Sequence, residues 1–421
     1  MQKLKRIQML WAGIIIILFL TLVGIPYAQG DTWYVRTDGL DTNGGTNWED
    51  SFQTIQRGIE EASTGDTVLV ADGTYTGVGN KNLDYYGKAI TIKSENGPDN
   101  CIIDCENSGR GLYFHSGEGV DSVVSGFTIT NGNKTGDYGG AIYCNDSSTP
   151  TIDNCIIKNN IGGQGGGIGC LRAGATVTNC QIINNTSNYG GGIYSLFPQR
   201  ATDNLIIINC TIAGNTATTI QGTGQGGGIL FVQPFSGANL TLTNSTIVNN
   251  TSDSGGGIYL GACAEPPIIN CIFWDNTPDP IFVNQCSPVV TFSNGSGYIG
   301  GDNMDEVPLF IDITDTDPIN WNLRLRSNSP CIDKGSNDAP FLPINDLDVK
   351  LRIIDGDSNE LPIADMGAYE FGDICECDFD DDLDQDGLDL ADYTNDNGGY
   401  GLSVFAADFT REDCPVYLLT P

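Results

Sequence analysis

The chain has 421 residues, and its 53 Asp and Glu against 19 Lys and Arg give a formal net charge of −34. A surface this acidic repels nucleic acid and anionic lipid, which excludes a nucleic-acid-binding protein. The chain has one histidine and its cysteines recur at repeat spacings without any CxxC pair, which argues against a zinc site.

The first 30 residues have the pattern of a signal peptide. Lys3, Lys5 and Arg6 form a basic start, residues 9–25 are uncharged and apolar, and residues 28–30 (Ala-Gln-Gly) suit a cleavage site. We therefore expect a secreted or cell-surface protein with no membrane span after signal removal. An uncleaved N-terminal anchor is the alternative, because the apolar run is at the lower limit for crossing a bilayer.

Residues 31–76 are predicted to form an N-terminal cap. Phe52, Ile55 and Ile59 have helical spacing within a helix expected over residues 51–62, and Gly65 is a candidate C-terminal cap. A short amphipathic helix over the end of a stack of strands would cover an open sheet edge.

Residues 77–300 contain a repeated phrase, in which two or three glycines precede an isoleucine and an Asn-Cys-x-Ile element follows. The equivalent isoleucines are separated by 26, 25, 36 and 29 residues and are Ile142, Ile168, Ile193, Ile229 and Ile258. A period in this range, with short stretches rich in Ile, Val and Thr, is typical of a solenoid. The predicted fold is all-β, a parallel β-helix with three strands per coil.

Two kinds of side chain recur once per coil and are predicted to stack. Asn159, Asn184, Asn249 and their neighbours are expected to form amide ladders at a corner. Cys155, Cys180, Cys210 and Cys271 share one repeat position, with Ser245 in the fourth copy, so they are interpreted as small inward-packing residues. Cys144 and Cys170 form a second aligned pair.

Residues 301–372 lack the glycine phrase. Apolar and polar residues alternate between Pro and Asp turns, which predicts the last coils and a C-terminal cap.

Residues 373–421 form a separate acidic tail with a predicted calcium loop. With Asp378 at position 1 of a twelve-residue loop, alternate carboxylates fall at ligand positions; they are Asp378, Asp380, Asp382, Asp384, Asp386 and Asp389. A register that starts at Asp382 is the alternative, with Gly387 at position 6 but Tyr393 at position 12. The other interpretation is an acidic run that only solvates the tail.

Catalytic residues cannot be assigned from the sequence. Between residues 139 and 277 the few acids and bases form no cluster at one repeat position. His115 follows an apolar stretch on a predicted strand and has no acidic partner nearby in sequence, so it is interpreted as a surface or hydrogen-bonded residue, with a general base as the alternative. Aromatic side chains such as Tyr194, Tyr259 and Trp274 are candidates for glycan binding.

Several segments together resemble known families. The GGAI and GGGI phrases with IFWDN resemble the right-handed β-helix repeats of polymorphic outer membrane proteins and secreted pectate-lyase-like proteins, and the C-terminal MGAYEF phrase resembles bacterial surface proteins. The tail resembles a dockerin-like or EF-hand-like calcium loop, although a dockerin proper has two such loops and the second is degraded here. This resemblance implies Ca²⁺ as the bound ion and carries over no catalytic residue.

The sequence therefore predicts a secreted or surface β-helix, non-catalytic, that serves adhesion, matrix formation or glycan binding. Its expected partners are a polysaccharide or cell-surface glycan and a protein that docks through the tail. The alternative is a polysaccharide lyase or glycoside hydrolase with scattered site residues.

Overall fold

In the computed structural model the description covers residues 30–372 except 197, 199, 220–221, 234–236, 264, 298–300 and 357–360. The signal-peptide pattern and the predicted calcium loop lie outside these residues. Within the described part, no helix is both long enough and apolar enough to cross a membrane.

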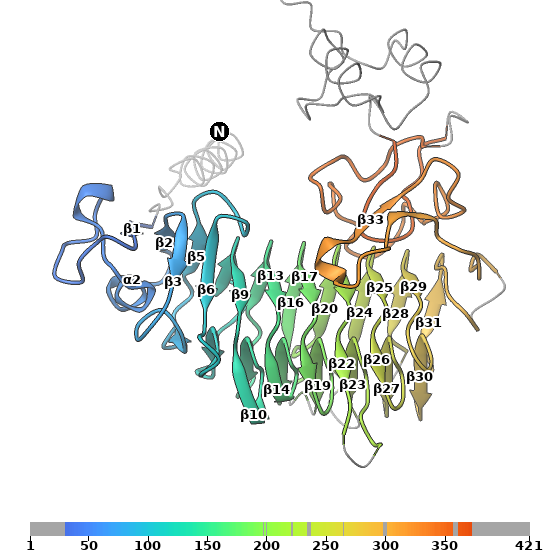
Figure 1. Cartoon of the computed structure of the whole chain (residues 1–421), viewed down its shortest axis with the longest axis horizontal. Coiled ribbons are helices and arrows are strands. Elements are labelled where there is room, and N and C mark those ends of the chain that lie inside the picture. The colour runs from blue at the N-terminus through green and yellow to red at the C-terminus, as the bar shows by residue number, and fades with distance from the viewer. Residues whose placement is uncertain are drawn as a thin grey trace, which may run out of the picture.

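The described chain winds into a parallel β-helix, which confirms the predicted all-β fold (Figure 1). Complete coils place one strand in each of three parallel sheets. Sheet A contains β1 Thr32–Val35, β2 Thr67–Val70, β5 Thr91–Ser94, β8 Val123–Ser125, β12 Thr151–Asp153, β16 Ala175–Thr178, β20 Leu205–Ile208, β24 Leu240–Thr243, β28 Pro267–Ile269 and β31 Val289–Thr291.

Sheet B contains β3 Gly73–Tyr75, β6 Cys101–Asp104, β9 Thr128–Thr130, β13 Ile156–Lys158, β17 Gln181–Ile183, β21 Thr211–Ala213, β25 Thr246–Val248 and β29 Ile272–Trp274. Sheet C contains β4 Leu83–Asp84, β7 Leu112–Phe114, β11 Ile142–Asn145, β15 Ile168–Leu171, β19 Ile193–Leu196, β23 Ile229–Val232, β27 Ile258–Gly261 and β30 Ile281–Asn284.

Five coils add a short fourth strand between sheets B and C. This sheet D contains β10 Asn133–Tyr138, β14 Ile161–Gln164, β18 Thr186–Ser187, β22 Thr216–Ala217 and β26 Thr251–Ser252. The glycine phrase forms the turn from sheet D to sheet C. At Gly165, φ is +70° and an added Cβ would lie 2.3 Å from the carbonyl oxygen of Ile168, so a side chain would clash there.

The repeat isoleucines pair in register and face the interior. Ile142, Ile168, Ile193, Ile229 and Ile258 are successive partners in sheet C and are fully buried. The cysteine ladder is likewise confirmed as inward packing, since Cys155, Cys180, Cys210 and Cys271 are buried free thiols. Ser245 replaces a thiol at this position, and its Oγ accepts the Cys210 amide at 3.2 Å.

The asparagine ladder is confirmed, and it uses the second residue of the corner dipeptide, which is Asn-Asn in three coils, Gly-Asn in one and Asp-Asn in the last. Its buried members are Asn160, Asn185, Asn215, Asn250 and Asn276. The side-chain oxygen of every member after Asn160 accepts hydrogen bonds from the backbone amide and the Nδ2 of the preceding member, at 2.9–3.0 Å. The first residue of the pair, such as Asn159 at φ +58°, instead makes the corner in the left-handed region.

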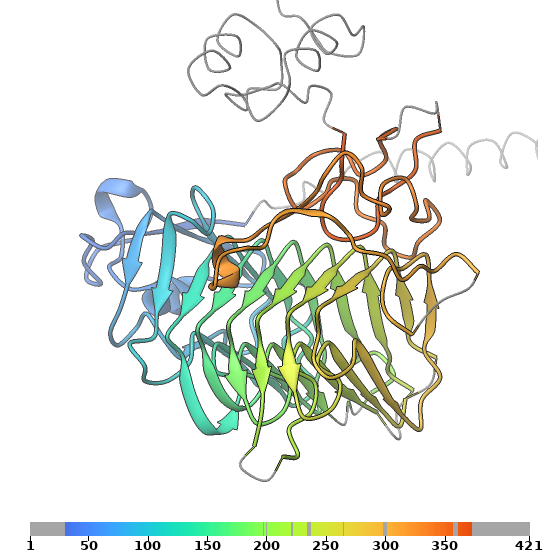
Figure 2. The ribbon, with the colours of Figure 1, turned by 45° about the vertical axis from the view of Figure 1, so that its right-hand side comes forward.

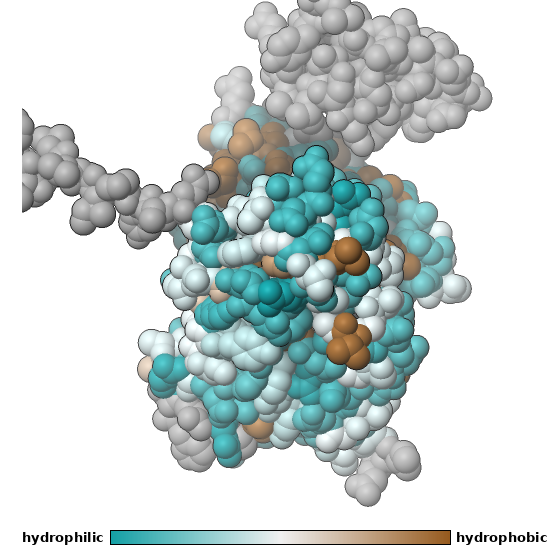
Figure 3. Space-filling model, turned by 90° about the vertical axis from the view of Figure 1, so that its left-hand side faces the viewer, coloured by the Kyte–Doolittle hydropathy of each residue, from teal (hydrophilic) through white to brown (hydrophobic). Residues whose placement is uncertain are grey.

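The N-terminal end of the stack is covered as predicted by a short helix. Helix α2 (Ile55–Glu61) is shorter than the expected helix, follows the 3₁₀ turn η1 (Trp48–Asp50), and buries Ile55 and Ile59 against the first rungs. The Thr54 Oγ1 accepts the Arg57 amide at 3.4 Å and caps its start. The surface at this end of the solenoid is largely hydrophilic (Figure 3).

Residues 301–372 add no strand to sheets A to D within the described chain. They contain the antiparallel pair β32 (Phe310–Asp312) and β33 (Asn322–Leu325) and the 3₁₀ turn η2 (Pro318–Asn320), and they lie along the side of the solenoid (Figures 1 and 2). Outward residues of sheet B, including Ile183, Ala213 and Val248, are buried beneath them. We call residues 301–372 the lateral segment.

Candidate functional site

A pocket of about 550 Å³ lies at the last coil of the solenoid. Its lining comes from β29, the turn that follows, the start of β30 and the loop after β31, and comprises Phe273, Trp274, Asp275, Asn276, Pro278, Asp279, Pro280, Ile281, Ser296, Gly297 and Asp305. This volume is in the range of small-molecule sites in proteins.

The pocket forms where the repeat changes its sequence. The five preceding coils connect sheet B to sheet C through a sheet D strand and a glycine turn, whereas this coil has Thr277-Pro278-Asp279-Pro280. Thr277 still makes an isolated bridge with Thr251, but each proline lacks the N–H that a further ladder would need. Sheet D therefore ends at β26, and the side chains of the turn surround a hollow.

The floor of the pocket is rigid and its rim is acidic. Phe273 is buried, and Asn276 is the last member of the asparagine ladder, whose Nδ2 donates to the Ile247 carbonyl at 2.8 Å. Asp275, Asp279 and Asp305 are exposed, and the described lining has no Arg, Lys or His. Such a rim repels anions and can accept hydrogen bonds from hydroxyl groups.

Of the three aromatic residues suggested by the sequence, the structure places only Trp274 at the pocket, where it is half-buried. Tyr194 and Tyr259 project from the outer face of sheet C but are 5% and 6% exposed, because neighbouring side chains such as Tyr138 and Leu230 cover them. Burial raises the pKa of the Tyr194 hydroxyl. These two rings therefore pack within the protein and offer no open stacking face.

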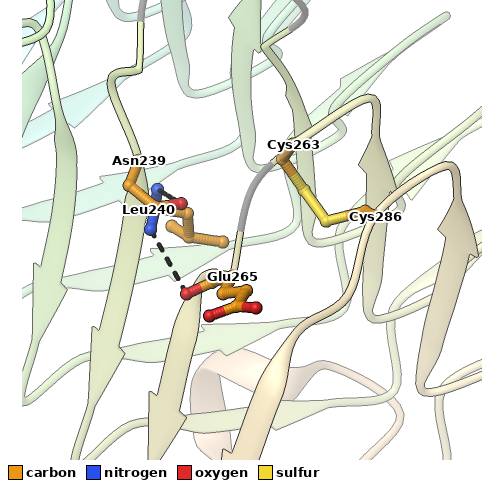
Figure 4. The surroundings of a disulfide bond; sticks show 5 residues. All are labelled: Asn239, Leu240, Cys263, Glu265 and Cys286. Atoms are coloured by element: carbon orange, nitrogen blue, oxygen red, sulfur yellow. Dashed lines mark hydrogen bonds between the residues drawn. A yellow bond between two sulfur atoms is a disulfide. The ribbon is translucent and has the colours of Figure 1, made fainter.

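A disulfide holds the last coil to the one before it. Cys263 follows β27 and Cys286 follows β30, and the bond joins the ends of these two paired strands (Figure 4). Nearby, Asn239 Nδ2 donates to the Glu265 carbonyl at 3.3 Å. The disulfide thus supports β30, whose first residue, Ile281, lines the pocket.

The structure also assembles a cluster that the sequence did not reveal. His115 Nε2 lies 3.1 Å from Asp84 Oδ2, and the imidazole stacks on Tyr113 with ring centroids 4.1 Å apart. The Arg110 guanidinium lies over the Tyr113 and Tyr143 rings and pairs with Asp137 at 2.6 Å. His115 has no acidic partner nearby in sequence, but it has one in space, because Asp84 lies one coil earlier on the outer face of sheet C.

Among the described residues, no three His, Cys, Asp or Glu side chains come together in a way that could hold a metal ion. The predicted calcium ligands Asp378, Asp380, Asp382, Asp384, Asp386 and Asp389 lie outside the described residues.

No protein-family model matches the chain. The uncharacterized protein YwoF of Bacillus subtilis (strain 168) is 31% identical over 144 residues, and the match spans 31% of this chain and 28% of YwoF. The chain therefore covers less than a third of that relative's length.

Three solved structures have a backbone path similar to that of this chain. Pectate lyase Pel9A has a TM-score of 0.44 at 13% identity, with 82% of this chain and 98% of that chain covered. A rhamnogalacturonan lyase has a TM-score of 0.33 at 15% identity, with 63% and 68% covered. The GH136 lacto-N-biosidase from Eubacterium ramulus has a TM-score of 0.30 at 12% identity, with 63% and 51% covered. At these TM-scores the likenesses carry no argument about function.

Proposed function

We propose that this protein is a secreted or cell-surface β-helix that binds a neutral saccharide without cleaving it, in the pocket of the last coil. The observation that carries the proposal is the combination of a half-buried tryptophan with hydrogen-bonding groups in one hollow. Trp274 lines the hollow and also packs against the apolar residues beneath the lateral segment, while Asp275, Asp279 and Asp305 form the rim.

This combination suits the two faces of a sugar ring. The C–H groups of a pyranose pack on an aromatic face, and its hydroxyls donate to carboxylates and pair with amides such as Asn276. The acidic rim disfavours uronates, because no cation among the described lining residues would balance a second negative charge. The ligand is therefore a neutral sugar unit at the end or a branch of a glycan.

Glycan binding is tested with the full mature chain on a panel of neutral and uronate glycans. We expect neutral glycans to bind, and Trp274→Ala to weaken binding by about tenfold or more, because a stacked ring contributes roughly 1–2 kcal/mol. Tyr86→Ala is the matched control, since it removes an exposed ring far from the pocket. Equal binding by the Trp274 variant would contradict the proposal.

The calcium-ordered tail is part of the proposed function. The six aspartates at alternate positions from Asp378 to Asp389 support it, since convergent oxygens bind Ca²⁺. Calcium titration calorimetry of the full mature chain should show heat at millimolar calcium that is lost in Asp378→Ala plus Asp382→Ala. Unchanged heat in this variant would place calcium elsewhere.

A second function, acid-base catalysis on a polysaccharide, is favoured by one observation, the Asp84–His115 pair. A carboxylate that holds one imidazole nitrogen leaves the other available as a general base. Incubation with uronate and neutral polysaccharides, with and without calcium, tests this candidate. Unsaturated or shortened products that disappear in His115→Gln would replace the binding proposal with an enzyme.

A further inference from the structure

The lateral segment carries a hairpin with exposed apolar side chains. Asn345 and Leu351 form an antiparallel bridge, and the Arg352 amide donates to the Ile344 carbonyl at 2.8 Å. Three large apolar side chains of this hairpin are mostly exposed, namely Ile344 at 82%, Val349 at 75% and Leu351 at 57%. We call residues 344–352 the apolar hairpin.

The base of the apolar hairpin is held by buried polar groups. The fully buried Arg352 donates through Nη2 to the Ala368 carbonyl at 2.8 Å and to the side chain of Asn209. The Asp346 carboxylate accepts the Lys350 amide at 2.8 Å and the Glu370 amide at 2.9 Å. The exposed apolar side chains therefore project from a hairpin whose base is held in place by these hydrogen bonds.

Exposed apolar side chains are concentrated in this part of the molecule. Phe341 and Ile353 flank the apolar hairpin, and both are exposed as well. In the view onto the N-terminal end, hydrophobic residues gather at the top, on the side of the lateral segment (Figure 3). A cluster of this kind on a soluble surface marks an interaction site.

The chain itself supplies a segment that starts beside this cluster. A Cβ placed on Gly372 would lie 3.2 Å from the Cα of Gly356 and 3.5 Å from the Cγ2 of Ile354, so the described chain ends close in space to Ile354, which follows the apolar hairpin closely in sequence. A few extended residues are enough to reach the apolar hairpin, at roughly 3.3–3.6 Å each. The tail contains apolar stretches, such as SVFAADF and VYLL, that can pack against exposed apolar side chains.

We propose that residues 373–421 dock on the apolar hairpin and that calcium strengthens this docking. The calcium dependence rests on the proposed calcium loop. Without the ion, the carboxylates of the loop repel one another; with it, their charge is balanced and the adjoining Leu388 and Leu390 are held in one arrangement. The tail is then a module attached to the side of its own solenoid.

Limited proteolysis of the full mature chain in millimolar calcium tests the docking. We expect Ile344→Asp plus Val349→Asp to speed cleavage within residues 373–421 by about tenfold or more, because two apolar contacts are lost. Val78→Asp plus Val120→Asp is the matched control, since both side chains are exposed on the N-terminal half. Equal cleavage rates in the hairpin variant and the wild type would overturn the docking.

Hydrogen exchange of the same proteins separates this inference from the proposed calcium loop. Slower exchange at residues 341–353 with calcium than with EDTA supports the inference. Calorimetric calcium binding without any change in this exchange keeps the calcium loop and overturns the docking. Light scattering completes the test, because a dimer that the hairpin variant converts to a monomer would assign the apolar hairpin to a second copy instead.

Discussion

Arg352 donates a hydrogen bond to the side-chain oxygen of Asn209, a residue 143 positions earlier in the chain. Asn209 forms the corner between sheets A and B at φ +56°, and the corresponding Asn244 and Asn270 bond to the Asp365 carbonyl and to the backbone of Ser336. The lateral segment thus attaches to the same corner of three successive coils.

Arg352→Ala should detach or loosen the lateral segment. The substitution leaves the buried Asn209 side-chain oxygen, the Ala368 carbonyl and the Glu370 carboxyl without their common donor, which costs on the order of 3 kcal/mol or more. Denaturant unfolding followed by circular dichroism measures the loss. Arg324→Ala is the control, because its ion pair with Asp348 is partly exposed and should contribute about 1 kcal/mol or less.

The attachment of the lateral segment should weaken as pH rises from about 4 to about 7. Burial raises the pKa of Asp365 to about 7. Burial and the charge of Asp365 together raise the pKa of Glu370. The other charged groups that face these two carboxyls are Asp333, Asp346 and Arg352. The folded state therefore binds more protons than the unfolded state, so stability is greatest near the unfolded pKa and falls with increasing pH.

Unfolding midpoints at several pH values from 4 to 8 check this dependence. Asp365→Asn should flatten the decline, because an amide does not ionise and keeps an oxygen to accept the Asp333 or Phe371 amide. The same slope in this variant would mean that another group carries the effect.

Asn215→Ala should destabilise the solenoid strongly. The side chain is fully buried; it accepts from Asn185 and donates to Asn250 and the Ile182 carbonyl, so its removal leaves several buried groups without partners. We expect a loss of about 2–4 kcal/mol. Asn188→Ala in the neighbouring coil, where the side chain is exposed, should change stability by less than about 0.5 kcal/mol. A similar loss of unfolding free energy in both variants would show that the buried ladder contributes no more to stability than an exposed asparagine.

Loss of the Cys263–Cys286 disulfide should act on the last coil. Cys263→Ser opens a link that closes a 23-residue separation, for which chain entropy predicts a loss of about 3 kcal/mol. Cys210→Ser is the control and should be nearly neutral, since Ser245 occupies the equivalent position in the next coil. Differential scanning calorimetry compares the two, and glycan binding should fall only in the Cys263 variant.

The coil architecture was predictable because each repeat position has one physical role. The glycine turn, the inward isoleucine and the small residue at Cys155 and its equivalents recur in sequence, and pairing in register brings like residues together. The pocket was predictable only in part. Trp274 was a candidate, but the Asp305 that completes its rim comes from a loop beyond the last coil.

One outward column of sheet B carries a sequence pattern that indicates a covered surface. Along one outward column, Thr130 and Lys158 are followed by Ile183, Ala213 and Val248. The change from polar to apolar residues occurs where the lateral segment begins to cover the sheet. An outward position that turns apolar for several coils predicts a cover, although it does not identify the covering segment.

The sequence by itself determined the solenoid, because stacking couples residues one repeat apart and each coil repeats the same local choices. Only the tertiary structure decided the contacts between residues that share no repeat relation. Asp84 meets His115 through the stagger between two coils, and Arg352 meets Asn209 through the return of the lateral segment. Neither contact appears as a repeat in the sequence, because Asp84 and His115 occupy non-equivalent positions of adjacent coils, and the Arg352 contact depends on where the non-repeating lateral segment comes to lie.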